Sequence, residues 1–402
     1  MSIICEEIDY MIEYKIDFYL QKREEYMEFR NLKKQYQILK EAIDSNIQRV
    51  LQRGDYILGQ EVSEIEKQLA EFVNVKHCVS CGNGTEALSL VLMAWGVGEN
   101  DAVFVPDITF FATSSVVSVA KATPIFVDID PDTFNMSPQS LEDAIKNVLA
   151  EGKLVPKVII PVDLYGQPAN YPEILAIAKK YGLKVLADSA QGFGGSINGQ
   201  MNCSFGDAGI TSFFPTKPLA CYGDGGAIFT NDDELAELLI SIRSQGKGDH
   251  RYNSVRIGVN SRLDTIQAAV LLVKLKAFKE VELKASQEVA QKYTEKLADY
   301  YKVPTILEGY QSSWSLYTLT LQSNQERDTL QKYLENRGIP TLVCYPIAVS
   351  DQKAYASAKH YTQLVNGHDL SKRILSIPMD PYKTDEEIDQ VVQALIDFKQ
   401  GA

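Results

Sequence analysis

No stretch of the 402-residue sequence is long and apolar enough for a membrane-spanning helix, which needs roughly 20 such residues. The first residues also lack the pattern of an export signal, because Glu6, Glu7, Asp9 and Glu13 stand among the apolar positions. We therefore expect a cytoplasmic protein with no membrane partner.

The sequence has no excess of positive charge. Its 40 lysines and arginines face 53 acidic residues, which leaves a net charge of −13. A chain this acidic does not suit non-specific binding to nucleic acid, so we expect no nucleic-acid partner. An anionic small substrate is not excluded, because a few local arginines decide whether such a molecule binds.

The cysteines are few and do not form a metal-binding pattern. Of the 6 cysteines, only Cys78 and Cys81 have the spacing of metal ligands, and no second pair or nearby histidine completes a site. The sequence therefore predicts no metal. We expect most of the cysteines to be reduced and buried.

What the sequence does contain is an alternation of strand and helix patterns. Hydrophobic residues make up 45% and charged residues 23%, which is typical of a globular protein with an ample core. Apolar runs predict strands at residues 76–80, 102–106, 124–129, 157–162, 183–188, 210–214 and 226–230. Helical patterns predict helices at 32–51, 61–72, 86–95, 137–149, 171–181 and 233–243, with another beginning in 107–113. This alternation indicates a mostly parallel sheet covered by helices on both faces, with ligands at the carboxyl ends of its strands.

The C-terminal part has a different pattern. Residues 259–303 contain no glycine or proline, so we expect one or two long helices that leave the large domain. A smaller α/β domain should follow, with strands at 314–321 and 341–345 and helices at 325–337 and 384–398. We divide the chain into an N-terminal extension (1–26), a large domain that includes the first long helix (27–260), and connecting helices with a small C-terminal domain (261–402).

Lys217 stands between Pro215 and Pro218, directly after the expected strand 210–214. Free lysine titrates near ~10.4, and burial or a nearby cation lowers this pKa. A lysine held at the end of a buried strand suits an amine that attacks a carbonyl. Taken alone, the same residues also fit a surface lysine in a turn.

Three further features fit a phosphate-bearing ring. The glycine-rich turn 82–85 enters a helix and includes Gly84 and Thr85, so it can be an anion site or only a helix cap. It is not a nucleotide P-loop, because no Gly-Lys-Ser/Thr follows. Phe110 or the neighbouring Phe111 could stack on a planar ring or pack in the core. Asp188 ends an apolar strand, where a buried carboxylate needs a cationic or hydrogen-bonding partner.

Together with Ser212, these residues match the needs of pyridoxal 5′-phosphate (PLP). Its phosphate needs N–H and hydroxyl donors, its ring an aromatic face, its ring nitrogen a carboxylate and its aldehyde a lysine. The order and spacing of these groups within one α/β domain point to this cofactor.

The chain resembles the DegT/DnrJ/EryC1/StrS sugar aminotransferases, PLP enzymes of fold type I, from about Met27 to the C-terminus. The motifs that carry the resemblance lie at 54–59, 83–85, 128–130, 164–168, 188–191, 212–217, 223–226 and 260–269. The resemblance implies a large domain with a mostly parallel seven-stranded sheet between helices, and a smaller C-terminal α/β domain.

The resemblance also implies roles for individual residues. Lys217 is then the catalytic lysine, which binds the cofactor's aldehyde and moves a proton between Cα and C4′, and Asp188 pairs with the ring nitrogen. Cofactor contacts are further expected from Gly84, Thr85 and Ser212 to the phosphate, Phe110 to the ring and Gln191 near the 3′-hydroxyl. Asn260 resembles a residue that reaches the phosphate from the neighbouring subunit. We therefore expect a homodimer with shared active sites.

Residues 212–232 resemble most the family members that aminate UDP-2-acetamido-2-deoxy-3-oxo-D-glucuronate. In those enzymes L-glutamate is the donor, pyridoxamine 5′-phosphate forms between the two half-reactions, and the product serves bacterial surface polysaccharides such as the lipopolysaccharide O-antigen. Arg262 corresponds to an arginine that meets the sugar's acidic group from the partner subunit, and a structural ion pair is its alternative role. The residues expected around the sugar are Tyr56, Arg262, Cys344 and Tyr345.

Two positions depart from the usual family pattern. Cys344 stands where relatives usually have histidine, and Asp163 stands where histidine or serine is common. We expect both to line the sugar pocket, so another UDP- or dTDP-linked 3- or 4-ketosugar stays open as the substrate. A catalytically silent regulatory or structural protein is the alternative of a different class. A PLP-dependent dehydratase is a third, but that branch has histidine in place of Lys217.

Overall fold

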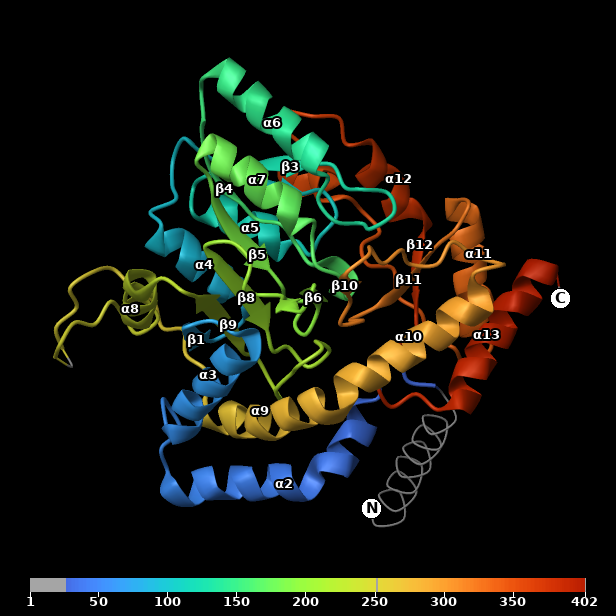
Figure 1. The fold of residues 1–402 in the computed structure, drawn as a ribbon, viewed down its shortest axis with the longest axis horizontal. Helices are drawn as coiled ribbons and strands as arrows, with labels where there is room; N and C mark the ends of the chain where they lie inside the picture. The colour runs from blue at the N-terminus through green and yellow to red at the C-terminus, as the bar shows by residue number, and fades with distance from the viewer. Residues whose placement is uncertain (1–26, 251, 402) are drawn as a thin grey trace, which may run out of the picture.

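The computed structural model describes residues 27–250 and 252–401, arranged as a sheet with helices packed around it (Figure 1). The N-terminal extension expected at residues 1–26 lies outside the described residues. Within the described ranges, none of the helices combines the length and the apolar character that crossing a bilayer requires.

The central sheet has seven strands in the order β1-β9-β8-β5-β4-β2-β3. Strands β2, β3, β4, β5 and β8 pair in parallel, whereas β9 runs antiparallel to both of its neighbours, β1 and β8. The predicted seven-stranded, mostly parallel sheet is confirmed. Its strands are β1 His77–Cys81, β2 Asp101–Pro106, β3 Thr123–Val127, β4 Val155–Ile159, β5 Lys184–Asp188, β8 Ala208–Ser212 and β9 Gly226–Thr230.

Helices cover both faces of this sheet. Alternate residues of β2 point to opposite sides, so Val103 and Val105 belong to one core and Ala102 and Phe104 to another. The first core is closed by α4 Gly84–Ala94, α5 Ala112–Val119 and α8 Asp233–Ile242. The second core is closed by α6 Pro138–Glu151 and α7 Tyr171–Tyr181. The prediction of a sheet covered on both faces is confirmed.

The helix expected to begin within 107–113 is α5, which starts at Ala112, near the end of that range. Asp107 is fully buried and its carboxylate accepts a 2.9 Å hydrogen bond from the backbone N–H of Ser350, so it holds a distant loop instead of starting a helix. Residues 107–111 therefore form a connection that reaches the carboxyl end of the sheet.

Two long helical segments lie beneath the sheet. Helix α2 Leu32–Arg53 ends at Gly54, whose φ of 76° suits glycine, and it lies alongside α9 Thr265–Ala277 (Figure 1). A π-helical turn, Phe278–Glu282, joins α9 to α10 Leu283–Leu297. Helix α9, this turn and α10 form one continuous helical segment that runs toward the C-terminal elements. The expectation of long helices within residues 259–303 is confirmed. Helix α3 Gln60–Val73 packs against α9 near β1.

The C-terminal elements enclose a core of their own. Strand β11 Tyr317–Thr320 pairs antiparallel with β12 Ile374–Ile377, and α10 packs against them through Tyr293 and Leu297. The remaining helices of this part are α11 Asn324–Glu335, α12 Val365–Arg373 and α13 Asp385–Gln400. The domain boundary at residues 260 and 261 stays a prediction.

The strand predicted at residues 341–345 is wrong. Only Leu342 forms a bridge there, to Ser376, while β12 supplies the strand that pairs with β11. Tyr345 instead faces the large domain, and Pro346 has no N–H for a strand ladder. The shorter elements are β6 Ser196–Ile197, β7 Gln200–Met201, β10 Tyr310–Gln311 and the 3₁₀ turns Leu164–Gly166, Val349–Asp351 and Lys353–Tyr355.

The C-terminal core yields a stability prediction. Leu297 is fully buried, so Leu297→Ala should lower the free energy of unfolding by roughly 2–5 kcal/mol through lost burial and a cavity. Leu149 on α6 is 50% exposed, and Leu149→Ala should change it by less than about 0.5 kcal/mol. Urea unfolding of both variants measures the difference. Equal losses would contradict the assignment of Leu297 to the core.

Candidate active site

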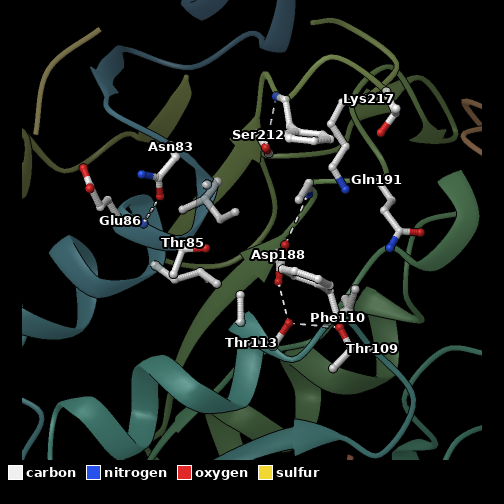
Figure 2. A pocket seen from close by; sticks show the side chains of 18 of the residues that line it. Asn83, Thr85, Glu86, Thr109, Phe110, Thr113, Asp188, Gln191, Ser212 and Lys217 are labelled. Carbon is white, nitrogen blue, oxygen red and sulfur yellow. Dashed lines mark hydrogen bonds between the residues drawn. The ribbon is translucent and has the colours of Figure 1, made fainter. Parts of the chain in front are cut away.

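A cavity of about 680 Å³ opens where strands β5 and β8 end and helices α4 and α5 begin. Figure 2 shows side chains from these segments directed toward its interior. Of the residues predicted to bind the cofactor, seven line the cavity: Gly84, Thr85, Phe110, Asp188, Gln191, Ser212 and Lys217.

Asp188 is buried at the floor of the cavity. Its Oδ2 accepts a 2.9 Å bond from the hydroxyl of Thr113, and its Oδ1 accepts a 3.2 Å bond from the backbone N–H of Ala190 (Figure 2). Burial raises the pKa of Asp188, and the bonds to Thr113 and Ala190 and the charge of Lys217 act against this rise. A cationic group in the cavity would favour the ionised carboxylate in the same way.

Lys217 lies in a turn that follows β8, here called the lysine turn (residues 215–218). Its backbone N–H donates to the carbonyl of Phe214 at 2.9 Å, and prolines flank it on either side. The side chain points into the cavity (Figure 2), where burial lowers the pKa of its amine and the charge of Asp188 partly opposes this. A lowered pKa makes the neutral, nucleophilic amine available nearer to neutral pH.

The start of helix α4 forms the opposite wall. Asn83 caps the helix by accepting a 2.8 Å bond from the N–H of Glu86. The first N–H groups of a helix have no acceptor within the helix itself, so those of Gly84 and Thr85 suit a ligand. A Cβ on Gly84 would lie 2.7 Å from Cβ of Ser212, so only glycine lets the helix start approach β8 this closely. Free N–H groups, the helix dipole and the hydroxyls of Thr85 and Ser212 together suit an anion such as phosphate.

Gln191 is held in one orientation. Its Oε1 accepts from the backbone N–H of Tyr165 and its Nε2 donates to the hydroxyl of Tyr345, both at 3.0 Å. Phe110 is 56% exposed, and its ring centroid lies 6.1 Å from that of Tyr345. Phe111 instead packs against Tyr355, so Phe110 is the aromatic residue with a face free for a ligand.

Four predicted site residues do not line the cavity: Tyr56, Asn260, Arg262 and Cys344. Tyr56 lies after α2, where its carbonyl accepts from the N–H of Thr265. Asn260 is exposed and bridges to Ser244, and Arg262 lies close to it in the chain. Asn260 and Arg262 were expected to act from a neighbouring subunit, and their roles stay predictions.

The expectation that Asp163 lines the sugar pocket is wrong, because its side chain is fully buried, whereas the expected role of Cys344 stays a prediction. Asp163 is fully buried behind Asp188, where its carboxylate accepts bonds from Ser189 Oγ at 2.5 Å and the Tyr171 hydroxyl at 2.8 Å. Its backbone N–H donates to the carbonyl of Asp188 at 3.0 Å. Cys344 is half-buried, while its neighbour Tyr345, also a predicted substrate residue, does line the cavity.

Sequence reasoning missed two residues that position the site. The hydroxyl of Thr113 holds the Asp188 carboxylate and is itself 2.9 Å from the hydroxyl of Thr109, four residues earlier in the chain. Tyr165 orients Gln191 through its backbone, in a left-handed conformation with φ 59°. The threonine spacing is a weak signal, whereas Tyr165 belongs to the 164–168 motif.

Four of the cysteines behave as predicted. Cys78, Cys81, Cys203 and Cys221 are free and buried, whereas Cys5 lies outside the described residues. Burial raises the pKa of Cys81 to about 12 and that of Cys221 to about 11, so these thiols keep their protons. In residues 27–250 and 252–401, no group of three or more His, Cys, Asp and Glu side chains could hold a metal ion.

Comparison with known proteins adds an independent finding. A model of the DegT/DnrJ/EryC1/StrS aminotransferase family matches residues 37–396. The UDP-2-acetamido-2-deoxy-3-oxo-D-glucuronate aminotransferase of Pseudomonas aeruginosa is 46% identical over 369 residues, covering 92% of this chain and 99% of that protein. A pleiotropic regulatory protein of Geobacillus stearothermophilus is 39% identical over 92% of this chain and 97% of its own. The crystal structure of a DegT/DnrJ/EryC1/StrS aminotransferase from Brucella abortus has a TM-score of 0.90 and 45% identity, covering 93% of this chain and 100% of that chain.

The buried carboxyl of Asp163 predicts a pH dependence of stability. Burial raises its pKa to about 7, whereas an unfolded aspartate titrates near ~3.9. As pH rises from about 4 to 7, the unfolded chain loses this proton first, so Asp163 lowers stability by up to about 1.4 kcal/mol per pH unit. The stabilisation that Asp163 provides is fully present below the pKa of the unfolded chain, and it is lost as the pH rises through the pKa of the folded chain.

The variant Asp163→Asn keeps a neutral side chain that can bond Ser189 and Tyr171. It should therefore gain stability relative to the wild type between pH 5 and pH 8, as measured by urea unfolding at both values. Asp299→Asn, at an exposed site, is the control and should follow the wild type. The same pH dependence in Asp163→Asn and the wild type would contradict the raised pKa.

Proposed function

Because the chain belongs to the DegT/DnrJ/EryC1/StrS aminotransferase family of PLP-dependent enzymes, we propose that it transfers an amino group from L-glutamate to a nucleotide-linked ketosugar. The observation that carries this proposal is the presence of Lys217, Asp188 and the start of helix α4 around one cavity. The substrate we propose is UDP-2-acetamido-2-deoxy-3-oxo-D-glucuronate, which the 46% identical Pseudomonas aeruginosa relative is named for.

The residues around the cavity fit PLP. The close approach of Gly84 to Ser212 leaves N–H groups and hydroxyls for a phosphate, and buried Asp188 would pair with the ring nitrogen. Phe110 would cover the ring face and Gln191 would face the 3′-hydroxyl. When bound, PLP supplies a carbonyl that can carry the amino group and a ring that accepts electrons.

Lys217 would perform the proton transfers. Its amine, with a pKa lowered by burial, would hold the cofactor at rest and then act as a base at Cα of glutamate. It would return the proton at C4′ and move protons in the opposite sense when the ketosugar accepts the amine. Asp188 would keep the ring nitrogen protonated, because a buried carboxylate is most stable beside a cation.

Another UDP- or dTDP-linked 3- or 4-ketosugar is the alternative substrate. Cys344 stands where relatives usually have histidine, and its neighbour Tyr345 lines the cavity. Burial raises the pKa of the Cys344 thiol, and the charge of Lys217 acts against this rise. Turnover of a panel of UDP- and dTDP-linked ketosugars with glutamate distinguishes the proposed substrate from these alternatives. Fastest turnover of the oxo-glucuronate would support our proposal, and preference for a neutral 4-ketosugar would overturn this choice.

The working unit we propose is a cytoplasmic homodimer that supplies surface polysaccharide synthesis. Residues 252–259 lie in a loop that projects beyond the sheet between α8 and α9 (Figure 1). Val255, Ile257 and Val259 are exposed there, and Ile57 and Leu58 are exposed near the start of α9. Exposed apolar side chains of this kind favour contact with another protein surface. A second subunit bound at this surface would lie close to Asn260 and Arg262 of the first.

A half-reaction tests the catalytic proposal. Purified protein with PLP should show the absorbance of the lysine-bound cofactor, and glutamate should remove that band. Lys217→Ala should slow the reaction by about a hundredfold to ten-thousandfold, since it lacks the general base. Lys332→Ala, at an exposed position on α11, is the control and should react like the wild type. An unchanged wild-type spectrum with glutamate and other amino donors would favour a catalytically silent protein.

Mixing two inactive variants tests the shared site. Lys217→Ala and Arg262→Ala homodimers should each be inactive, but a hybrid dimer carries one site with both residues intact. Random exchange of subunits should therefore restore about one quarter of wild-type activity in a dimer with isologous symmetry. Activity that stays at the level of the separate variants, despite subunit exchange shown by mass spectrometry, would place both residues in one subunit's site.

A further inference from the structure

Arg30, which precedes helix α2 and lies outside the cavity, contacts the backbone of the lysine turn. Its Nη1 donates to the carbonyl oxygen of Thr216 at 2.7 Å and to that of Lys217 at 2.8 Å. These oxygens belong to the two peptide groups on either side of the Lys217 Cα atom. Because peptide groups are planar, holding both of them fixes φ and ψ of Lys217, and with them the direction of its side chain.

The chain around Arg30 is held from the opposite side by the C-terminal part. The backbone N–H of Asn31 donates to Asp380 Oδ2 at 3.2 Å, and the carbonyl of Phe29 accepts from Met379 at 3.1 Å. Lys383 Nζ donates to the carbonyl of Glu28 at 2.6 Å. Residues 28–31 therefore lie between the lysine turn and residues 379–383, and Arg30 is not free to move away from the turn.

The charges around Arg30 suit an arginine. Burial lowers the pKa of its guanidinium, and the charges of Asp380 and Glu282 act against this effect and favour the cation. Charge-assisted bonds from an arginine to carbonyl oxygens are stronger than neutral ones. Among the described residues, Arg30 donates to the backbone carbonyls of Thr216 and Lys217 and to no side chain that lines the cavity, so any effect on chemistry passes through the lysine turn.

We propose that Arg30 is a positioning residue for Lys217, which holds the two flanking peptide groups and so aims the amine into the cavity. The inference rests on the proposed catalytic role of Lys217. The positive charge of Arg30 has a second effect. Burial lowers the pKa of the Lys217 amine and the charge of Arg30 lowers it further, while Asp188 and Cys344 raise it. Arg30 thus acts on both the place and the protonation of the reacting nitrogen.

The first test uses protein freed of cofactor, so that it does not depend on turnover. The amine of Lys217 is acylated with a small reagent across a pH series, and mass spectrometry follows the labelled peptide. Arg30→Met should move the pH of half-maximal labelling upward, because both the cation and the fixed turn are lost. Arg30→Lys keeps the charge and should label close to the wild type.

The second test uses the holoenzyme and the glutamate half-reaction. Arg30→Met should slow it by about tenfold to a hundredfold, with a smaller change in the glutamate concentration for half-saturation, because a misplaced amine costs rate. Arg30→Lys should recover part of the rate. Arg373→Met is the control: Arg373 Nη1 makes the same kind of bond, to the carbonyl of Leu321 at 2.8 Å, far from Lys217 in the C-terminal part.

The outcomes separate this proposal from the proposed function. If Arg30→Met matches Arg373→Met in both labelling and half-reaction, Arg30 only stabilises the fold and the proposal is overturned. If Lys217→Ala reacts like the wild type, the proposed function fails, while the labelling still reports whether Arg30 controls the lysine. Should Arg30→Met not fold, Arg30→Gln replaces it, and labelling and a half-reaction of Arg30→Gln equal to those of the wild type overturn the proposal.

Discussion

The opposition of Asp188 and Lys217 across one buried cavity is the constraint on which the rest of the site depends. Burial disfavours the charge on each group, and each supports the charge of the other. The sheet fixes their separation, because Asp188 at the end of β5 is in register with Ile210 on β8, and β8 leads directly into the lysine turn. Thr113 and the N–H of Ala190 stabilise the carboxylate. The site is thus prepared for a cationic nitrogen beside Asp188.

The same strands also determine where an anion can sit. A Cβ on Gly84 would meet Ser212 at 2.7 Å, and one on Gly226 would meet the backbone of Asn83 at 2.6 Å. Glycine at these two positions lets the start of α4, the end of β8 and the start of β9 pack with backbone nearly in contact. The N–H groups of α4 and the hydroxyl of Ser212 therefore lie at the same end of the sheet as Asp188 and Lys217, as a phosphate-bearing ring requires.

Patterns within the sequence predicted those elements that local physics decides. The apolar run of β9 and the amphipathic pattern of α7 were predicted with the bounds that the structure has, Gly226–Thr230 and Tyr171–Tyr181. The prediction failed where distant partners decide: of residues 341–345 only Leu342 bridges to β12, at Ser376, and Tyr345 lines the cavity. The strand propensity of a segment does not tell which distant residues the segment contacts in the fold.

In the site, too, the residues marked by local sequence were predicted and those that depend on distant contacts were not. Lys217 and Asp188 could be found because prolines and a strand end mark them in the sequence, and the motifs added Gly84, Thr85 and Ser212. Arg30 could not be found, because it meets Lys217 only through folding across more than half of the large domain. Asn260 and Arg262 stay predictions, since their expected contacts are with another subunit and not with the cavity of their own.

Asp163 shows how an unusual residue can be accommodated behind the reacting groups. Two ionised carboxylates cannot both be stable in so small a buried volume, so one of them keeps its proton more readily. Burial raises the pKa of Asp163 to about 7, and its carboxyl group accepts bonds from Ser189 and Tyr171. Below that pH Asp163 is mostly neutral and adds no charge beside Asp188, whose carboxyl group lines the cavity. The departure at Asp163 therefore leaves the charge opposite Lys217 in place, and any change in sugar preference must come from residues nearer the opening, such as those around Tyr345.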